Sequence, residues 1–223
     1  MGRTRTDGRP YLLLKARASQ LPLSSDSVSL VIATPPFLGV RCRPKADYCT
    51  SDPYEYRSLM SIFLAEATRI VKPRRHILLI SGRERTGKSK GARRVVFHVI
   101  QKLGSRGHWT HRRVKSATFL THYMKVKNFP WWALSIRLYR NLIRCYSEPG
   151  EIVAHVFSGS GNGGIAALES ARTPILIDSH YQRQVRRRLE KKVQSANKSC
   201  SFSSFRLTES APSYNAHNVC GSI

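Results

Sequence analysis

Apolar residues along this chain fall into two kinds of pattern. Short runs that are apolar almost throughout, such as residues 28–33 and 152–157, are typical of strands buried on both faces. Longer segments, such as residues 54–71, repeat apolar side chains at the three- and four-residue spacing of a helix, and Pro73 closes that helix. Strands are expected at residues 11–15, 28–33, 77–80, 152–157 and 175–178, and helices at residues 54–71, 135–143, 165–170 and 182–193.

The strand expected at residues 28–33 leads into a loop with the sequence Thr34-Pro35-Pro36-Phe37. Two consecutive prolines fix the backbone and remove its N–H donors. The loop keeps its carbonyl oxygens, the hydroxyl of Thr34 and the aromatic face of Phe37. These groups can accept hydrogen bonds from a ligand and stack against it.

A second loop follows the strand expected at residues 152–157. Its sequence is FSGSGNGG, with glycines at positions 159, 161, 163 and 164. Glycines let a backbone turn tightly beneath a ligand, and the helix expected from residue 165 would point its N-terminus at that ligand. The loop therefore predicts a site for a ligand with an anionic group.

Together the two loops resemble the catalytic and cofactor motifs of amino-methylating DNA methyltransferases. The catalytic motif of that family is an acid, Asn or Ser followed by Pro-Pro and an aromatic residue, and its cofactor motif is close to Asp-Pro-Phe-Ala-Gly-Ser-Gly. Here they read TPPF and HVFSGSG, and the catalytic motif comes first, which is the order of a permuted class within the family. The resemblance extends over residues 12–37, 54–82 and 129–189.

This resemblance implies an α/β fold of the Rossmann-like, S-adenosylmethionine-dependent methyltransferase type. A mostly parallel sheet would carry helices on both faces, in a single domain over residues 1–194. The chain would transfer a methyl group from S-adenosylmethionine to an exocyclic amine of a base flipped out of double-stranded DNA.

The catalytic residues that the resemblance implies are Thr34, Pro35, Pro36 and Phe37. The Thr34 hydroxyl and the Pro35 carbonyl would accept hydrogen bonds from the amine, and Phe37 would stack the flipped base. Ser at the first position is typical of family members that act on N4 of cytosine, and Asp or Asn of those that act on N6 of adenine. Because Thr34 is chemically nearest to Ser, N4 of cytosine is favoured.

The cofactor-binding residues implied in the same way are His155, Phe157, Ser158, Gly159, Ser160, Gly161 and Asp178. Three acids of the family pattern are replaced, by Arg17, His155 and Leu176, and Asp178 is the candidate substitute for the last of them. A cofactor that carries an ammonium and a sulfonium prefers nearby carboxylates, so these replacements should weaken its binding. The alternative is a catalytically degenerate, DNA-binding relative.

The charge of the chain also indicates a polyanionic partner. Lys and Arg number 38 against 13 Asp and Glu, a formal net charge of +25, and nucleic acid is the first candidate. Residues 83–128 form a basic insert with interleaved aromatic residues, where the permuted class has its target-recognition region. The candidate DNA-binding residues are Arg83, Arg85, Lys88, Arg93, Arg94, Arg112, Arg113 and Lys115. The alternative is a basic surface that only contacts solvent.

A competing motif lies at the start of this insert. Residues 82–89 fit the phosphate-binding pattern G-x-x-x-x-G-K-[ST] and follow an apolar run. In a P-loop NTPase, Lys88 would contact the β and γ phosphates, Ser89 would bind magnesium, and Asp178 could complete the metal site. That interpretation leaves both other loops unexplained, so it ranks below a methyltransferase.

The remaining features limit partners and location. The five cysteines include no Cys-x-x-Cys pair, so free thiols are expected and no metal site. No apolar run has the length of a membrane span, which predicts a cytoplasmic protein of a microbe or a virus-infected host cell, without a membrane partner. Residues 195–223 are expected to be a polar, disordered tail. A cognate restriction endonuclease of a restriction-modification pair, and a monomer or homodimer, are compatible with the sequence.

Overall fold

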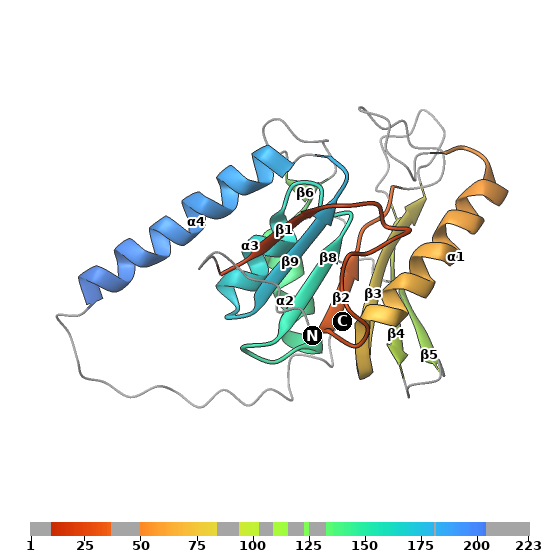
Figure 1. Ribbon diagram of the computed structural model, residues 1–223, viewed down its shortest axis with the longest axis horizontal. Coiled ribbons are helices and arrows are strands. Elements are labelled where there is room, and N and C mark those ends of the chain that lie inside the picture. Colours follow the sequence, from red (N-terminus) through yellow and green to blue (C-terminus); the bar gives the residue numbers. More distant parts are fainter. Residues whose placement is uncertain are drawn as a thin grey trace.

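The computed structural model describes residues 10–36, 50–83, 94–102, 109–115, 123–124, 133–180 and 182–203. Within them a seven-stranded sheet forms the centre of the molecule, and helices flank it (Figure 1). Its strands are β1 (Leu12–Lys15), β2 (Val28–Ala33), β3 (Val71–Arg83), β4 (Arg94–Lys102), β5 (Trp109–Lys115), β8 (Ile152–Val156) and β9 (Thr173–Asp178). The helices are α1 (Pro53–Ile70), α2 (Ile136–Tyr146), α3 (Asn162–Glu169) and α4 (Gln182–Ser203), and β6 (Tyr123–Met124) pairs with β7 (Ala133–Leu134) in a second sheet.

The strands of the large sheet lie in the order β1-β9-β8-β2-β3-β4-β5. Neighbours from β1 to β3 are parallel. β4 is antiparallel to both β3 and β5, so β4 alone among these seven strands runs against the others. The mostly parallel sheet expected from the sequence is confirmed.

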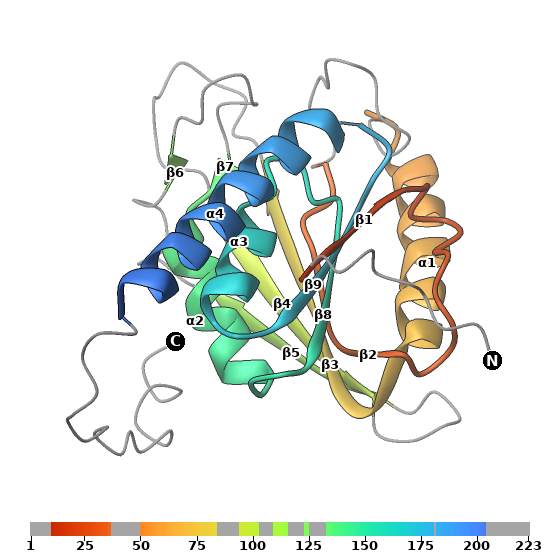
Figure 2. The same ribbon diagram turned by 60° about the vertical axis from the view of Figure 1, so that its left-hand side comes forward.

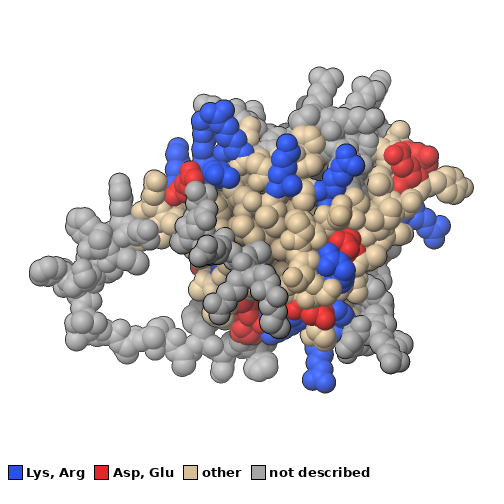
Figure 3. Space-filling model, viewed as in Figure 1, with Lys and Arg blue, Asp and Glu red and all other residues tan. Residues whose placement is uncertain are grey.

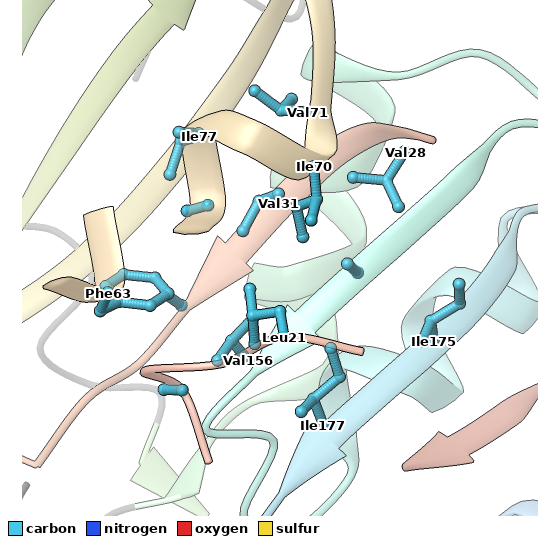
Figure 4. Close-up of a cluster of buried hydrophobic side chains, with 14 of the residues drawn as sticks. Leu21, Val28, Val31, Phe63, Ile70, Val71, Ile77, Val156, Ile175 and Ile177 are labelled. Carbon is cyan, nitrogen blue, oxygen red and sulfur yellow. The ribbon is translucent and has the colours of Figure 1, made fainter. Parts of the chain in front are cut away.

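The two faces of the sheet bury separate cores, because side chains of β2 point alternately to each. Val31 and Ala33 pack on the face that α1 covers, where Phe63 lies against the sheet (Figure 4). Leu30 and Ile32 pack on the opposite face with residues of α2 and α3. Figures 1 and 2 show α1 on one side of the sheet and α2, α3 and α4 on the other, which confirms helices on both faces.

Local sequence determines where the first two helices begin. Asp52 caps α1 by accepting a hydrogen bond from the backbone N–H of Tyr54 at 2.8 Å, and Pro53 occupies the first helical position, where no N–H is needed. Ser135 caps α2 through the backbone N–H of Leu138 at 3.2 Å. α2 continues to Tyr146, three residues beyond the predicted end.

The basic insert predicted at residues 83–128 contains two strands of the central sheet that were not expected from the sequence. β4 and β5 complete one edge of the central sheet. Charged and polar residues hide the apolar pattern in β5, whereas β4 has an apolar run at residues 95–100 that was assigned to the basic insert as a whole. Lys102 of β4 is only 4% exposed, and its ammonium donates to Asp26 at 2.6 Å and to the Val71 carbonyl at 2.9 Å. Part of the insert therefore belongs to the scaffold of the fold.

The last helix differs from the prediction at its far end. α4 continues beyond residue 194, where the domain was expected to end, through Ser203. Adding residues to an established helix costs little compared with starting one, so the polar residues from 195 to 203 can extend it without an apolar pattern. In the described part of the chain, no helix is both long enough and apolar enough to cross a membrane.

Candidate functional site

Three adjacent strands end side by side where the sequence places its two loops. β2 lies beside β8, with Ala33 paired to Val156, and β8 lies beside β9. The Thr34 N–H donates to the Val156 carbonyl at 3.4 Å, so the catalytic loop leaves its strand directly next to the glycine-containing loop. Ligands of open parallel sheets bind at the carboxyl ends of the strands, so this edge is the candidate active site.

The loop after β8, residues 157–161, is a tight turn that we call the glycine turn. Its backbone has positive φ at Phe157 (56°), Gly159 (47°) and Gly161 (76°), and the Gly161 N–H donates to the Ser158 carbonyl at 2.9 Å. Gly161 is the N-cap of α3, and a β-carbon there would lie 2.8 Å from a methyl of Val185. Both its conformation and its surroundings therefore require glycine.

α3 starts at Asn162, three residues before the predicted start at residue 165. The prediction assigned Gly163 and Gly164 to the loop, because glycine disfavours helices. A β-carbon on Gly163 would come within 2.3 Å of the His155 ring, and one on Gly164 within 2.7 Å of Leu176. These glycines let α3 pack closely on β8 and β9, which brings its first N–H groups to the candidate site.

Asp178 connects the end of β9 to the glycine turn. Its carboxylate accepts hydrogen bonds from the Gly159 N–H and the His180 N–H, both at 2.8 Å. Burial raises the pKa of Asp178, and the two N–H donors act in the opposite direction. Leu176, at the position where the family pattern has an acid, is fully buried, whereas the Asp178 carboxylate contacts the glycine turn.

Thr34 has a partner that the sequence did not indicate. Its hydroxyl lies 3.1 Å from the phenol oxygen of Tyr139 on α2, and both residues are buried. Burial raises the pKa of Tyr139 to about 12, so the phenol stays protonated. Tyr139 looks like one more apolar residue on the buried face of a helix, and only its phenol oxygen marks it as a polar residue in need of a partner.

His155 lies beneath α3, where it has little surface to offer a ligand. It is 2% exposed, and its ring centroid lies 4.9 Å from that of Tyr139. Neither ring nitrogen has a hydrogen-bond partner among the described residues. Burial lowers the pKa of His155 to about 3, so the ring is neutral at physiological pH. We therefore assign His155 to the support of the glycine turn and not to contact with a ligand.

The buried His155 predicts a loss of stability in mild acid. The unfolded chain binds a proton at this histidine below about pH 6.5, whereas the folded protein resists it down to a pKa of about 3. His155 therefore does not lower the free energy of unfolding above about pH 6.5. As the pH falls from 6.5 towards 3, the free energy of unfolding decreases, because the unfolded chain binds a proton that the folded protein does not. We expect His155 to cost the folded state about 2 kcal/mol between about pH 7 and about pH 4.5.

Urea unfolding of the wild type and of His155→Leu at both pH values tests this expectation. Leucine cannot ionise, so the variant should lose about 2 kcal/mol less than the wild type over this range. Other groups titrate equally in both proteins, which makes the wild type the control for their contribution. Equal pH dependence in the two proteins would show that His155 is protonated freely in the folded state.

Two further residues that the sequence analysis missed support the glycine turn. Arg188 of α4 donates hydrogen bonds to the Ser160 carbonyl and, at 2.8 Å, to the side-chain oxygen of Asn162. The Asn162 amide in turn donates to the Leu134 carbonyl at 2.7 Å. An arginine in a basic helix carries no sequence signal for this role, because neighbouring arginines look the same.

Some of the other predicted site residues lie in the described part of the chain, and the rest lie outside it. Pro35 and Pro36 are buried beside Thr34, and Arg17 is exposed two residues beyond the end of β1. Arg83, Arg94, Arg112, Arg113 and Lys115 lie in β3, β4 and β5. Phe37, Arg85, Lys88 and Arg93 lie outside the described residues. The described part of the chain contains no group of three side chains that could hold a metal ion.

The competing phosphate-binding motif lies in a different setting from a P-loop. Gly82 and Arg83 continue β3, and Arg83 pairs with Arg94 of the antiparallel strand β4. A P-loop instead leads from its strand into a helix. Asp178 lies on a strand three positions away from β3, roughly 14 Å across the sheet. Lys88 and Ser89 of the motif lie outside the described residues.

Solved structures with a similar fold include DNA methyltransferases. The chain is 15% identical to TTHA0409 of Thermus thermophilus, a candidate DNA modification methylase, with a TM-score of 0.57 over 82% of this chain and 95% of that one. The same protein bound to S-adenosyl-L-methionine gives 0.54, at 15% identity over 82% and 94%. The cytosine-N4-specific PvuII DNA methyltransferase gives 0.55, at 16% identity over 85% and 94%. No protein-family model and no curated protein matches the sequence.

The sheet order, the single reversed strand and these similarities define the class of the fold. It is the Rossmann-like methyltransferase fold, as the sequence predicted. More narrowly, it is the fold of solved DNA methyltransferases, including one specific for N4 of cytosine.

Proposed function

We propose that this protein is an S-adenosylmethionine-dependent DNA methyltransferase that methylates an exocyclic amine of a flipped base. The observation that carries the proposal is the adjacency of the two loops. Ala33 and Val156 are paired in register, so Thr34 and the glycine turn leave strands about 5 Å apart. An amine held at one loop would meet a methyl donor held at the other, and proteins of this fold include one solved with S-adenosyl-L-methionine.

The residues at the glycine turn fit this cofactor. The first N–H groups of α3 have no acceptor within the helix and suit the carboxylate of the cofactor. The Asp178 carboxylate contacts the turn and suits the ammonium and sulfonium groups of the cofactor. The buried Ser158 hydroxyl has no hydrogen-bond partner in the described part of the chain. The neutral ring of His155 adds no positive charge. When bound, S-adenosylmethionine supplies a methyl group activated by its sulfonium.

Thr34 suits the task of orienting an amine. The lone pair of an exocyclic amine is delocalised into the base, so acceptors must draw its hydrogens out of the ring plane. A hydroxyl has two lone pairs and one proton. If Thr34 donates its proton to Tyr139, both lone pairs stay available for the amine. The Pro35 carbonyl would be the second acceptor, and Phe37 would stack the base. The preference for N4 of cytosine over N6 of adenine rests on the hydroxyl of Thr34, which is chemically nearest to the Ser typical of family members that act on cytosine.

Calorimetric titration of the purified protein with S-adenosylmethionine, repeated with ATP and magnesium, tests the proposal. Saturable binding of S-adenosylmethionine alone is the expected result. Binding of ATP alone would overturn it in favour of an NTPase that uses residues 82–89. DNA binding without cofactor binding would indicate a degenerate relative.

Identification of the methylated nucleoside tests the choice of base. Double-stranded DNA incubated with the protein and methyl-labelled cofactor should yield labelled N4-methylcytosine after digestion to nucleosides. Label in N6-methyladenine would overturn the preference for cytosine while leaving the methyltransferase itself intact.

A further inference from the structure

The outer face of α4 carries a row of exposed basic side chains. Arg183, Arg187 and Lys191 lie four residues apart, on one face of the helix, and Arg186 is exposed beside them. We call these four residues the α4 ridge. Arg183 and Lys191 are separated by about 12 Å along the helix axis. Figure 3 shows Lys and Arg side chains gathered over the beginning of α4.

The ridge carries four basic side chains and has one acidic neighbour on α4, Glu190, which lies one turn after Arg186 and Arg187. The ion pair that α4 forms there joins Lys192 to Glu169 at 2.6 Å, on a different face of the helix. Glu190 is the one acidic residue of α4, and no described ion pair connects it to the ridge. Like charges four residues apart repel each other, and basic residues in the first turns oppose the helix dipole. Such an arrangement favours an anionic partner.

The inner face of α4 argues against a membrane surface as that partner. Val185 and Leu189 are fully buried against Leu176 and Ile165. An amphipathic helix binds a bilayer by inserting its apolar face, and here that face is already used by the core. The ridge therefore offers charge alone, which suits the phosphate backbone of a nucleic acid.

The ridge begins near the carboxyl ends of the parallel strands, where the candidate site lies. The Gln182 amide donates to the carbonyls of Leu14 and Asp178, at 3.1 and 3.0 Å, which fastens the start of α4 to the ends of β1 and β9. Arg188 of the same helix holds the glycine turn. β5, which contains basic residues of the predicted interface, lies at the opposite edge of the sheet, roughly 29 Å from β1. The site lies between the two.

We propose that the α4 ridge binds the phosphate backbone of the duplex whose base is methylated. It would be a second contact surface, in addition to the insert at residues 83–128. This inference rests on the proposed function, because it takes the DNA substrate as the partner. A 12 Å length of duplex carries about seven phosphate charges, enough to engage all four side chains of the ridge. The contact is independent of DNA sequence and increases affinity wherever the recognised site lies.

The test compares two variants of the full chain that lose the same charge. One is Arg183→Gln/Arg187→Gln/Lys191→Gln on the ridge. The matched control is Lys72→Gln/Arg74→Gln/Arg144→Gln, three exposed basic residues at the opposite, amino-terminal edge of the sheet. Affinity for a duplex of arbitrary sequence is measured by fluorescence anisotropy over a series of salt concentrations. Calorimetry with S-adenosylmethionine shows that each variant keeps a folded site.

We expect the ridge variant to bind DNA at least about tenfold more weakly than the control at physiological salt. The slope of log K against log salt should decrease in magnitude by about 2 to 3, close to 0.9 for each phosphate that the variant no longer neutralises. The control should stay within about threefold of the wild type, because distant charges act only through a screened field.

Three other outcomes are informative. If the wild type binds DNA and the two variants have equal DNA affinity, the proposal that the α4 ridge binds DNA is overturned. The proposed function is then unaffected. A wild type that does not bind DNA would overturn both. Stronger ridge-dependent binding to phosphatidylcholine vesicles containing phosphatidylserine than to duplex DNA would overturn the assignment of the partner.

Discussion

Asp178→Asn is expected to weaken the binding of S-adenosylmethionine by about tenfold to a hundredfold, because it removes the carboxylate that reaches the glycine turn. Both carboxylate oxygens of Asp178 accept backbone N–H groups, from Gly159 and His180. An amide keeps one acceptor and turns an NH₂ group towards the other N–H, so the turn loses a hydrogen bond as well as the charge. Calorimetric titration measures the change in affinity directly.

A matched control separates the local effect from the loss of one negative charge. Asp52→Asn removes a carboxylate at the N-cap of α1, where Asn is an equally good cap, so both stability and cofactor affinity should stay near those of the wild type. Unchanged cofactor affinity in Asp178→Asn would show that the carboxylate has no part in binding. A parallel loss of cofactor affinity in Asp52→Asn would point to a general charge effect.

Thr34→Val should reduce the rate of methyl transfer by about a hundredfold or more while leaving the affinity for S-adenosylmethionine nearly unchanged. The variant keeps the shape of the side chain but removes the acceptor that we assign to the amine. It also leaves the buried Tyr139 phenol without its partner, which should lower the free energy of unfolding by about 1–3 kcal/mol. Single-turnover methylation of duplex DNA and urea unfolding measure the two effects.

The double variant Thr34→Val/Tyr139→Phe distinguishes catalysis from stability. With both polar groups removed, no buried hydroxyl of this pair is left unpaired, so most of the lost stability should return. Methyl transfer should stay low, because the acceptor is still missing. If activity returned together with stability, Thr34 would have a structural role only. Thr34→Ser keeps the hydroxyl and is expected to stay within a few-fold of the wild-type rate.

Much of the fold was predictable because its parallel strands are buried on both faces. Residues 28–33 form β2 with the expected ends, and the strands at residues 77–80 and 175–178 were found within the longer β3 and β9. A continuous apolar run between turn residues has few other stable solutions in a protein of this size. The strands β4 and β5 were not predicted. Basic residues interrupt the apolar pattern of β5, and the apolar run of β4 at residues 95–100 was assigned to the basic insert that surrounds it.

The residues of the candidate site also divide into those that the sequence predicted and those that it did not. The two motifs pointed to Thr34 and the glycine turn through their resemblance to family motifs, because prolines fix the backbone and glycines permit a tight turn. Tyr139 and Arg188 were missed, since the hydrogen bonds they form join residues far apart in the sequence. His155 was predicted to bind the cofactor, and it is buried in the core, because a strand position does not indicate which layer will cover it.

The sequence by itself predicted the two loops, the class of fold that their resemblance to methyltransferase motifs implies, and a negatively charged partner. The motif resemblance, the burial of apolar runs and the net charge can all be read along the chain without placing it in space. Only the tertiary structure decided that Thr34 pairs with Tyr139, that Asp178 reaches the glycine turn, and that the α4 ridge starts beside the site. These are contacts between separate elements, and their geometry depends on how the helices pack against the sheet.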